Sequence, residues 1–287
     1  RIYGAIWNTL DIHNSIIGEF PSGGIYTDGE EDLSIDYSDI IEGQSSITIN
    51  PENLTYENNI DADPRFIDAE NDNYNLFASS RLINAGDPSV TDADSSRSDI
   101  GAYPYLNDYD GEASWSVSAD TGDDITGTGD PNGIPFATIQ AGLNFARDNQ
   151  TVNVASGTYF ELGGDVFTNV LGTEELVPVI WPDSTYKKGV QLLGEDSENT
   201  IIDGDNNGKV MLIRDVDATS FMSGFTLTNG YLESPNDQGG GMWISFSDLS
   251  FENLRIIDNV STSVGGGIYI SWANPYFKNV LISNNES

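Results

Sequence analysis

The chain has 287 residues, with 11 Lys and Arg against 46 Asp and Glu and a formal net charge of −35 at pH 7. This charge argues against nucleic acid and anionic lipid as partners, because their phosphates attract basic surfaces and repel acidic ones. The sequence contains no cysteine and no apolar run long enough to span a membrane. We therefore expect no disulfide bonds, no thiolate metal sites and no membrane insertion.

The first part of the chain combines short alternating stretches with glycine-containing bends. GGIY at residues 23–26 precedes LSIDYSDI at 33–40, where apolar and polar residues alternate with the period of a β-strand. The only histidine, His13, stands in LDIHNSII, and we expect it at the surface rather than in catalysis. The alternation then decays between residues 59 and 104.

A change of composition marks the middle of the chain. Residues 105–130 are rich in Gly, Asp, Ser and Thr, which is typical of a linker. The sequence PFATIQAGLNFARDNQ at 135–150 predicts a helix with one apolar face and with Gln140, Asn144 and Arg147 on the wet face. The segment TVNVASGTY that follows alternates as a strand.

The last part of the chain contains a repeat. GGGMWISF begins at Gly239 and GGGIYISW begins at Gly265, 26 residues later, and FENLRIIDN at 251–259 returns as FKNVLISNN at 277–285 with the same shift. In each copy the alternating positions are apolar, namely Met242, Ile244 and Phe246 in the first copy and Ile268, Ile270 and Trp272 in the second. We therefore expect these side chains to face inward and to stack in register.

A repeat of this length, without a helical period, corresponds to one turn of a coil built from short strands and tight bends. Successive turns then pair as parallel strands, about 4.8 Å apart. The glycine triplets fit bends that require positive φ or a close approach of two backbones. Asn259 and Asn285 suit a further bend, since asparagine tolerates left-handed backbone and stacks as an amide ladder.

Three groups of motifs carry a family resemblance. The pairing of GGGMWI with FENLRIIDN, and of GGGIYI with FKNVLISNN, resembles the repeats of the pectin-lyase-like superfamily and of chlamydial polymorphic outer-membrane proteins. NIDADPRFIDAENDNYNLFASSRLINAGDP followed by DIGAYP is similar to the closing segment of bacterial surface proteins of the choice-of-anchor Q type. PFATIQ, TVNVASGTY and LLGEDSENTIIDGDNNGKV resemble the opening of many secreted β-helix domains, in which the helix caps the first turn.

This resemblance implies an all-β chain made of two portions of a right-handed parallel β-helix, the second with one short N-terminal capping helix. Residues 1–110 are expected to hold the last turns and the closing segment of a first β-helix. Residues 111–133 are expected to form a linker and the start of the second domain, and 134–287 the capped first turns of a second β-helix, cut short at its C-terminus. We expect this segment to belong to a longer chain outside the cell or on a bacterial cell surface.

The fold alone does not assign an activity, because the family includes lyases, hydrolases, adhesins and inert stalks. A polysaccharide lyase needs Arg or Lys as a base, with calcium held by carboxylates. Arg255 and Asp258 are the catalytic candidates, but the counterparts of Arg255 in the neighbouring turns are Thr226 and Leu281, and no acidic cluster accompanies it. We therefore expect no catalysis within this segment.

Calcium is the one cofactor that the sequence suggests. The turn with Asp203, Asp205 and Asn207 matches the first half of a D-x-D-x-[DN]-G loop, although its twelfth position, where Glu is needed, is Arg214. The alternative is a plain polar turn. The acidity of the chain fits either calcium binding or simple solvation of the surface.

Trp243 and Tyr269 are expected to face outward one turn apart, and Tyr26 holds the matching place in GGIY. They are candidates for contact with sugar rings; the alternatives are cross-strand stabilisation and burial beneath a loop. The sequence thus predicts a non-catalytic, adhesin-like or carbohydrate-engaging scaffold whose partner is a polysaccharide or a cell-surface glycan. The alternatives are a polysaccharide lyase or glycoside hydrolase whose active turns lie outside this segment, and an inert stalk.

Overall fold

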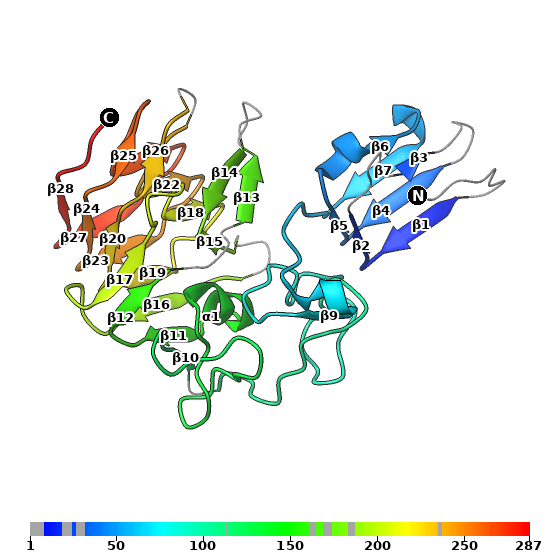
Figure 1. Ribbon diagram of the computed structural model, residues 1–287, viewed down its shortest axis with the longest axis horizontal. Coiled ribbons are helices and arrows are strands. Elements are labelled where there is room, and N and C mark those ends of the chain that lie inside the picture. Colours follow the sequence, from blue (N-terminus) through cyan, green and yellow to red (C-terminus); the bar gives the residue numbers. More distant parts are fainter. Residues whose placement is uncertain are drawn as a thin grey trace. The chain divides into compact units, whose positions relative to one another are not determined.

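The structure is a computed structural model that describes residues 9–18, 25–26, 32–112, 114–160, 165–168, 174–182, 187–234 and 237–287. The chain divides into two compact units, residues 1–107 and 108–287. Both consist mainly of short strands in parallel sheets, and α1 (Ile139–Phe145) is the single α-helix of the described residues (Figure 1). No helix within the described ranges is long and apolar enough to cross a membrane. The described part of the chain is therefore all-β apart from one short α-helix.

The first unit is built on a parallel sheet of order β1-β4-β7, whose strands are β1 (Leu10–His13), β4 (Leu33–Asp36) and β7 (Leu54–Glu57). Two shorter parallel pairs accompany it, β2 (Ile16–Ile17) with β5 (Asp39–Ile40) and β3 (Ile25–Tyr26) with β6 (Ile47–Thr48). The predicted alternation is confirmed in β4, since Leu33 and Ile35 lie in the buried core while Ser34 and Asp36 are partly exposed.

The closing part of the first unit has little regular structure. It contains one antiparallel pair, β8 (Phe66–Asp68) and β9 (Asn73–Leu76), and the 3-10 helices of the unit are η1 (Gly43–Ser46), η2 (Pro51–Asn53) and η3 (Ala69–Asn71). Beyond β9, the segment to Asn107 is held by turns and by side chain to backbone hydrogen bonds. The loss of alternation in this part of the sequence therefore corresponds to a loss of strands.

The second unit contains three parallel sheets that the chain visits in turn. The six-stranded sheet has the order β10 (Trp115–Val117), β11 (Thr151–Val154), β16 (Gln191–Gly194), β19 (Phe221–Ser223), β23 (Ser250–Glu252) and β27 (Tyr276–Lys278). The five-stranded sheet has the order β12 (Gly157–Tyr159), β17 (Thr200–Asp203), β20 (Thr226–Thr228), β24 (Arg255–Ile257) and β28 (Leu281–Ser283). The four-stranded sheet has the order β15 (Val179–Trp181), β18 (Met211–Arg214), β22 (Met242–Ser245) and β26 (Ile268–Ser271). Two smaller pairs complete the unit, the parallel β21 (Tyr231–Leu232) with β25 (Val260–Ser261) and the antiparallel β13 (Asp165–Thr168) with β14 (Glu174–Val177).

The predicted register between the two repeats is confirmed. β22 pairs in parallel with β26, β23 with β27 and β24 with β28, which places Phe251 opposite Phe277 and Ile256 opposite Ile282. The two phenylalanine rings stack with their centroids 5.0 Å apart. Because one shift aligns all three sheets, equivalent side chains form columns across successive strands.

The structure corrects the expected inward direction of Phe246 and Trp272. Both follow the last residue of their strands in left-handed backbone, with φ of 49° and 51°, and are 53% and 84% exposed. A left-handed residue breaks the two-residue period of a strand, so the inward series stops at Ile244 and Ile270.

The glycine triplets serve both expected purposes. Gly239 and Gly265 have φ of 72° and 70°, the left-handed region that glycine enters freely. The next glycine, Gly240, instead lies close to another backbone, since a Cβ atom there would stand 2.4 Å from the carbonyl oxygen of Val260. Each triplet therefore combines a turn with a close packing of chain on chain.

The asparagine ladder is present, but the left-handed residues stand one place earlier than predicted. Asp258 and Asn284 have φ of 57° and 56°, whereas Asn259 and Asn285 have no positive φ. The buried Asn259 side chain donates to the Asn285 side-chain oxygen at 3.0 Å and to two backbone carbonyls, and it accepts from the Gly230 amide at 2.8 Å. The ladder thus holds three segments of backbone together.

The helix is shorter than residues 135–150, and two of its polar residues are not on a wet face. Thr138 caps its N-terminus, and α1 packs against β10, β11 and β15. Gln140 and Asn144 are buried and hydrogen-bonded to each other, and Gln140 also accepts from the Ile180 amide at 2.8 Å. Only Arg147, past the end of the helix, is exposed as predicted. The helical period predicted that Gln140 and Asn144 would face water. Their side chains instead bond each other, and Gln140 also bonds the neighbouring strand β15.

Residues 111–133, expected as a linker and the start of the second domain, contain the first strand of the six-stranded sheet. Trp115 of β10 is buried, stacks on Phe136 and packs at an angle on Phe145. Its indole nitrogen donates to Gln150 at 2.8 Å. These contacts join β10 to the helix segment.

Candidate functional site

The predicted sugar-contact pair, Trp243 and Tyr269, consists of register partners in β22 and β26. Their ring centroids are 6.4 Å apart and their planes meet at 64°, so the rings lie edge to face. Both side chains are partly buried. An edge-to-face pair stabilises the two strands against each other but does not offer one flat surface.

A buried lysine occupies one face of the Trp243 ring. The ammonium nitrogen of Lys209 lies 5.1 Å from the ring centroid and donates to the Gln238 carbonyl at 2.6 Å. Leu212, which pairs with Trp243 from β18 and faces the same side, is only 2% exposed. The outer surface of the four-stranded sheet is therefore covered at this level, and Trp243 is engaged within the unit by a cation–π contact.

Tyr26, the third predicted aromatic, lies in the first unit. It is the outward residue of the two-residue strand β3, next to the buried Ile25, and it is 42% exposed. It thus belongs to a different unit of the chain from Trp243 and Tyr269.

Sequence reasoning missed the exposed pair Phe246 and Trp272, which we name the aromatic corner. The Phe246 amide donates to the Ser271 carbonyl, and the Asp215 amide donates to the Ser245 carbonyl. Asp215, Phe246 and Trp272 therefore occupy the same corner after three neighbouring strands, β18, β22 and β26, and all three have left-handed backbone. The available signal was Asp215, since a residue that suits left-handed backbone marks the position at which the strand period stops.

Polar side chains flank the aromatic corner in sequence. The Asp248 carboxylate accepts from the backbone and the side-chain nitrogens of Asn274 at 2.9 and 3.3 Å. One turn earlier, Arg214 and Asp215 form an exposed ion pair at 3.2 Å. The corner thus combines aromatic surface with exposed carboxylate, amide and guanidinium groups.

The predicted calcium turn is closed by its own hydrogen bonds. Both Asp203 carboxylate oxygens accept from the Asn229 side chain, at 3.0 and 2.9 Å, and Asp203 also accepts from the Asp205 amide. The amide of Asn207 donates to the Gly204 carbonyl. Within the described ranges, no group of three or more His, Cys, Asp or Glu side chains is arranged to hold a metal ion. The geometry is that of a polar turn that docks on the next turn of the chain.

The two catalytic candidates do not form a constellation. Arg255 begins β24 between Thr226 and Leu281, as the spacing predicts, and is partly buried. Asp258 lies in the turn that follows the strand and is exposed. No hydrogen bond or ion pair joins the side chains of these two described residues.

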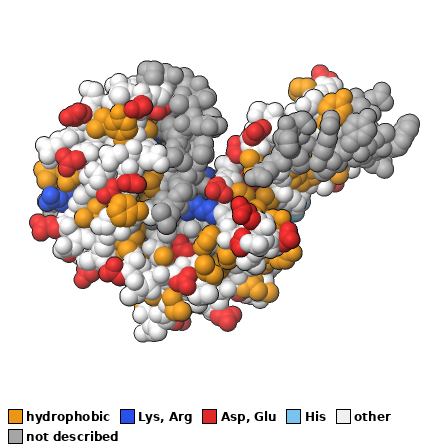
Figure 2. Space-filling model, viewed as in Figure 1, with side chains coloured by type: hydrophobic (Ala, Val, Ile, Leu, Met, Phe, Trp, Pro, Cys, Tyr) orange, Lys and Arg blue, Asp and Glu red, His pale blue; other side chains and the backbone are white. Residues whose placement is uncertain are grey.

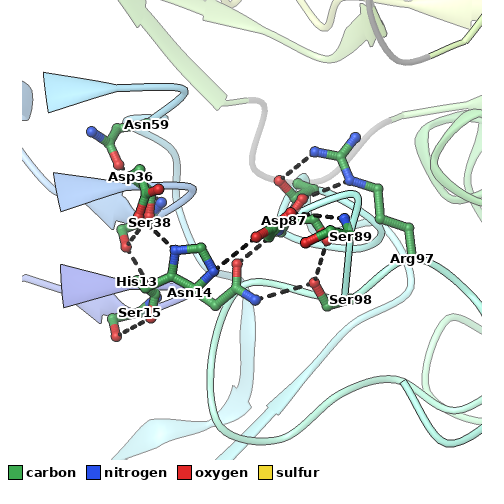
Figure 3. Close-up of polar contacts among 12 residues, drawn as sticks. His13, Asn14, Ser15, Asp36, Ser38, Asn59, Asp87, Ser89, Arg97 and Ser98 are labelled. Carbon is green, nitrogen blue, oxygen red and sulfur yellow. Dashed lines mark hydrogen bonds and ion pairs between the residues drawn. The ribbon is translucent and has the colours of Figure 1, made fainter. Parts of the chain in front are cut away.

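His13 is the centre of a polar network in the first unit (Figure 3). Its Nδ1 lies 2.5 Å from Asp36 and its Nε2 lies 3.2 Å from Asp87, with the imidazole 40% exposed. Both ring nitrogens thus face carboxylates. His13 therefore joins strand β1 to the segment that carries Asp87.

The neighbours of His13 reinforce this connection. Asn14, in left-handed backbone, accepts from the Asp87 amide at 2.8 Å and donates to Ser98 at 3.2 Å. The amide and hydroxyl groups of Ser89, followed by the charge of His13, hold the pKa of the Asp87 carboxyl below its usual range. A carboxylate with these partners stays ionised and anchors the closing segment.

Asp99 is the most perturbed acid of the closing segment. Burial raises its pKa to about 7, although its carboxylate accepts from the amides of Asn84 and Tyr105, both at 2.7 Å. The nearby Asp92 and Asp94 raise the pKa further. Asp99 thus holds the backbone amides of Asn84 and Tyr105 together. Because burial disfavours its charged form, the free energy of this arrangement depends on pH.

The chain matches no family model, no curated protein and no solved structure.

Proposed function

We propose that residues 108–287 form the capped first turns of a right-handed parallel β-helix and that residues 1–107 form the closing turns of another. Two features support this architecture: the chain enters the three sheets of the second unit in a repeating order, and each strand pairs with its counterpart one turn on. The position of α1 against β10, β11 and β15 suits a cap on the first turn. The handedness is taken from the resemblance to pectin-lyase-like proteins.

The function that this geometry supports best is a non-catalytic scaffold of a large secreted or bacterial cell-surface protein, adhesin-like and engaging a polysaccharide or cell-surface glycan. One observation carries the proposal: the exposed rings of Phe246 and Trp272 follow equivalent positions of two paired strands, about one strand spacing apart. Repeating glycan units can contact such a surface at both levels, and weak contacts made together give useful affinity.

The charge of the surface favours a neutral glycan. Asp and Glu side chains are spread over the visible faces, whereas few Lys and Arg appear there (Figure 2). With a net charge of −35, the chain repels polyanions such as polygalacturonate at low ionic strength. A neutral polysaccharide experiences no such repulsion.

The test is a glycan array probed with the purified chain, followed by affinity gel electrophoresis in soluble polysaccharides. Retention by a neutral glycan supports the scaffold function, and a blank array would identify an inert stalk. Release of unsaturated chain ends from pectate or alginate, in the presence of calcium, would instead identify a polysaccharide lyase.

Calcium remains a separate proposal for Asp203, Asp205 and Asn207. An ion there would replace the Asn229 side chain as the partner of Asp203 and would stabilise the folded state by mass action. Thermal melts with calcium and with EDTA decide the matter, since equal melting temperatures exclude a site of useful affinity.

A further inference from the structure

The aromatic corner carries a conformational penalty that the fold does not explain. Left-handed backbone is rare for bulky residues because Cβ crowds the following carbonyl, at about 1–2 kcal/mol per residue. Asp215 holds the same corner one turn before Phe246, and Asp is among the residues that tolerate this conformation. Phe246 and Trp272 therefore strain the backbone without burying their rings in return. Residues with strained backbone of this kind cluster at functional sites.

The Phe246 ring is exposed although its backbone is paired on both sides. The turn of Phe246 is paired on one side with the turn of Asp215 and on the other with that of Trp272, through the Ser245 and Ser271 carbonyls. Phe246 is nevertheless 53% exposed. A strand stacked on either side therefore does not cover the ring, and the corner faces solvent at each level.

The chemistry of the corner suits one class of ligand. A pyranose ring presents a face of C–H groups, which packs on an aromatic ring, and an edge of hydroxyl groups, which exchange hydrogen bonds with planar polar side chains. The corner supplies both kinds of contact, through Phe246 and Trp272 on one hand and Asp248 and Asn274 on the other. Arg214 pairs with Asp215, so the Asp248 carboxylate and the net charge of −35 are what disfavour an anionic sugar.

We propose that the aromatic corner is a contact site for a neutral polysaccharide, whose sugar rings pack on Phe246 and Trp272 while Asp248 and Asn274 bind hydroxyl groups. This inference rests on the proposed function and places it at the corner rather than at Trp243 and Tyr269. The more exposed Trp272 makes the larger contact, and Phe246 extends the surface by one turn.

The decisive variant is the double substitution Phe246→Asn and Trp272→Asn. Asparagine is favoured in left-handed backbone, so the variant is expected to melt at or above the temperature of the unmodified chain. Its affinity for the polysaccharide is expected to fall at least about tenfold, as when an aromatic anchor of an interface is removed. Phe160→Asn is the matched control, because Phe160 is 49% exposed in the same unit but does not occupy the corner.

Affinity gel electrophoresis in a soluble β-glucan, a galactomannan and an arabinoxylan, with polygalacturonate as the anionic comparison, measures each variant. Retardation by a neutral polymer that persists in Phe160→Asn and disappears in the double variant supports the site. Equal retardation of the double variant and the unmodified chain overturns the site and leaves the scaffold function standing. If no polymer retards the unmodified chain, the proposed function fails together with the site.

Sedimentation velocity excludes another occupant. Self-association of the unmodified chain that the double variant abolishes would make the corner an interface between copies, which overturns the proposal. A chain that stays monomeric in both forms, with glycan binding lost only in the double variant, supports it.

Discussion

Replacement of Gly240 by alanine tests the close packing of chain on chain at the glycine triplets. A Cβ atom at this position would lie 2.4 Å from the Val260 carbonyl oxygen and 2.8 Å from that of Gly266. Ordinary contacts begin near 3.4 Å, so the Val260 carbonyl has to retreat by about 1 Å. The Ser261 amide belongs to the same rigid peptide group as this carbonyl, so the movement strains the bond from that amide to the Glu286 carbonyl, now 3.0 Å long.

We expect Gly240→Ala to lower the free energy of unfolding of the second unit by about 2–4 kcal/mol, the sum of overpacking and a weakened backbone hydrogen bond. For a unit of this size, about 2–4 °C of melting temperature is lost per kcal/mol, which gives a decrease of roughly 5–15 °C. Thermal and urea melts followed by circular dichroism measure both quantities.

Gly133→Ala is the matched control, since Gly133 lies in an exposed loop and its nearest neighbour to an added Cβ is the Asp130 side chain at 3.2 Å. It is expected to change stability by less than about 1 kcal/mol. If the two variants melt at the same temperature, the close backbone approach is not a requirement of the fold, and the register deduced from the triplets loses its physical basis.

Three further predictions concern the core, the ladder and a buried acid. Ile256→Ala should lower the free energy of unfolding by about 2–5 kcal/mol, because Ile256 is fully buried. The same change at its register partner, Ile282→Ala, should cost less than about 1 kcal/mol, because Ile282 is 54% exposed. Equal urea midpoints for the two variants would contradict this prediction. Asn259→Ala should destabilise by about 2–4 kcal/mol, since it removes the side-chain partner of the Gly230 amide and of two carbonyls. Hydrogen exchange should rise first at residues 227–230, and unchanged exchange there would rule out the ladder as a brace. Folding raises the pKa of the Asp99 carboxyl from 3.8 to about 7. Between these two pH values the folded state therefore retains a proton that the unfolded state has released. The resulting contribution to stability is fully present below pH 3.8 and is lost as pH rises through 7. Exchange of residues 84–105 should therefore quicken between pH 4 and 7, after correction for intrinsic rates, by more than in Asp99→Asn, and a parallel course in both proteins would contradict the assignment.

The sequence alone determined how the strands of the two repeats align and, apart from Phe246 and Trp272, which of their side chains face inward. The 26-residue shift and the two-residue alternation are sufficient for this, because a slip of one residue would turn every inward side chain outward. Phe251 over Phe277 and Ile256 over Ile282 followed directly from it. The bends at the glycine triplets were also predictable, since few other residues fit there.

Only the tertiary structure decided what happens where the period stops or where distant residues meet. Phe246 and Trp272 turned outward because each of them is itself in left-handed backbone directly after its strand, a change that the apolar pattern does not record. Gln140 is buried because the Ile180 amide donates to its side chain. That partner lies 40 positions further along the sequence, so the helical period gives no sign of it.

The same limit applies to the candidate sites. Trp243 lies on the side of its strand that the alternation predicted. Its contact with Lys209 was not predictable, because the repeat does not align Lys209 with Trp243. His13 met Asp87 only through the path of an irregular segment. Periodicity fixes the face on which a side chain stands, because it is a property of the local backbone. The partner that the side chain meets there is set by contacts between remote segments, which only the folded chain brings together.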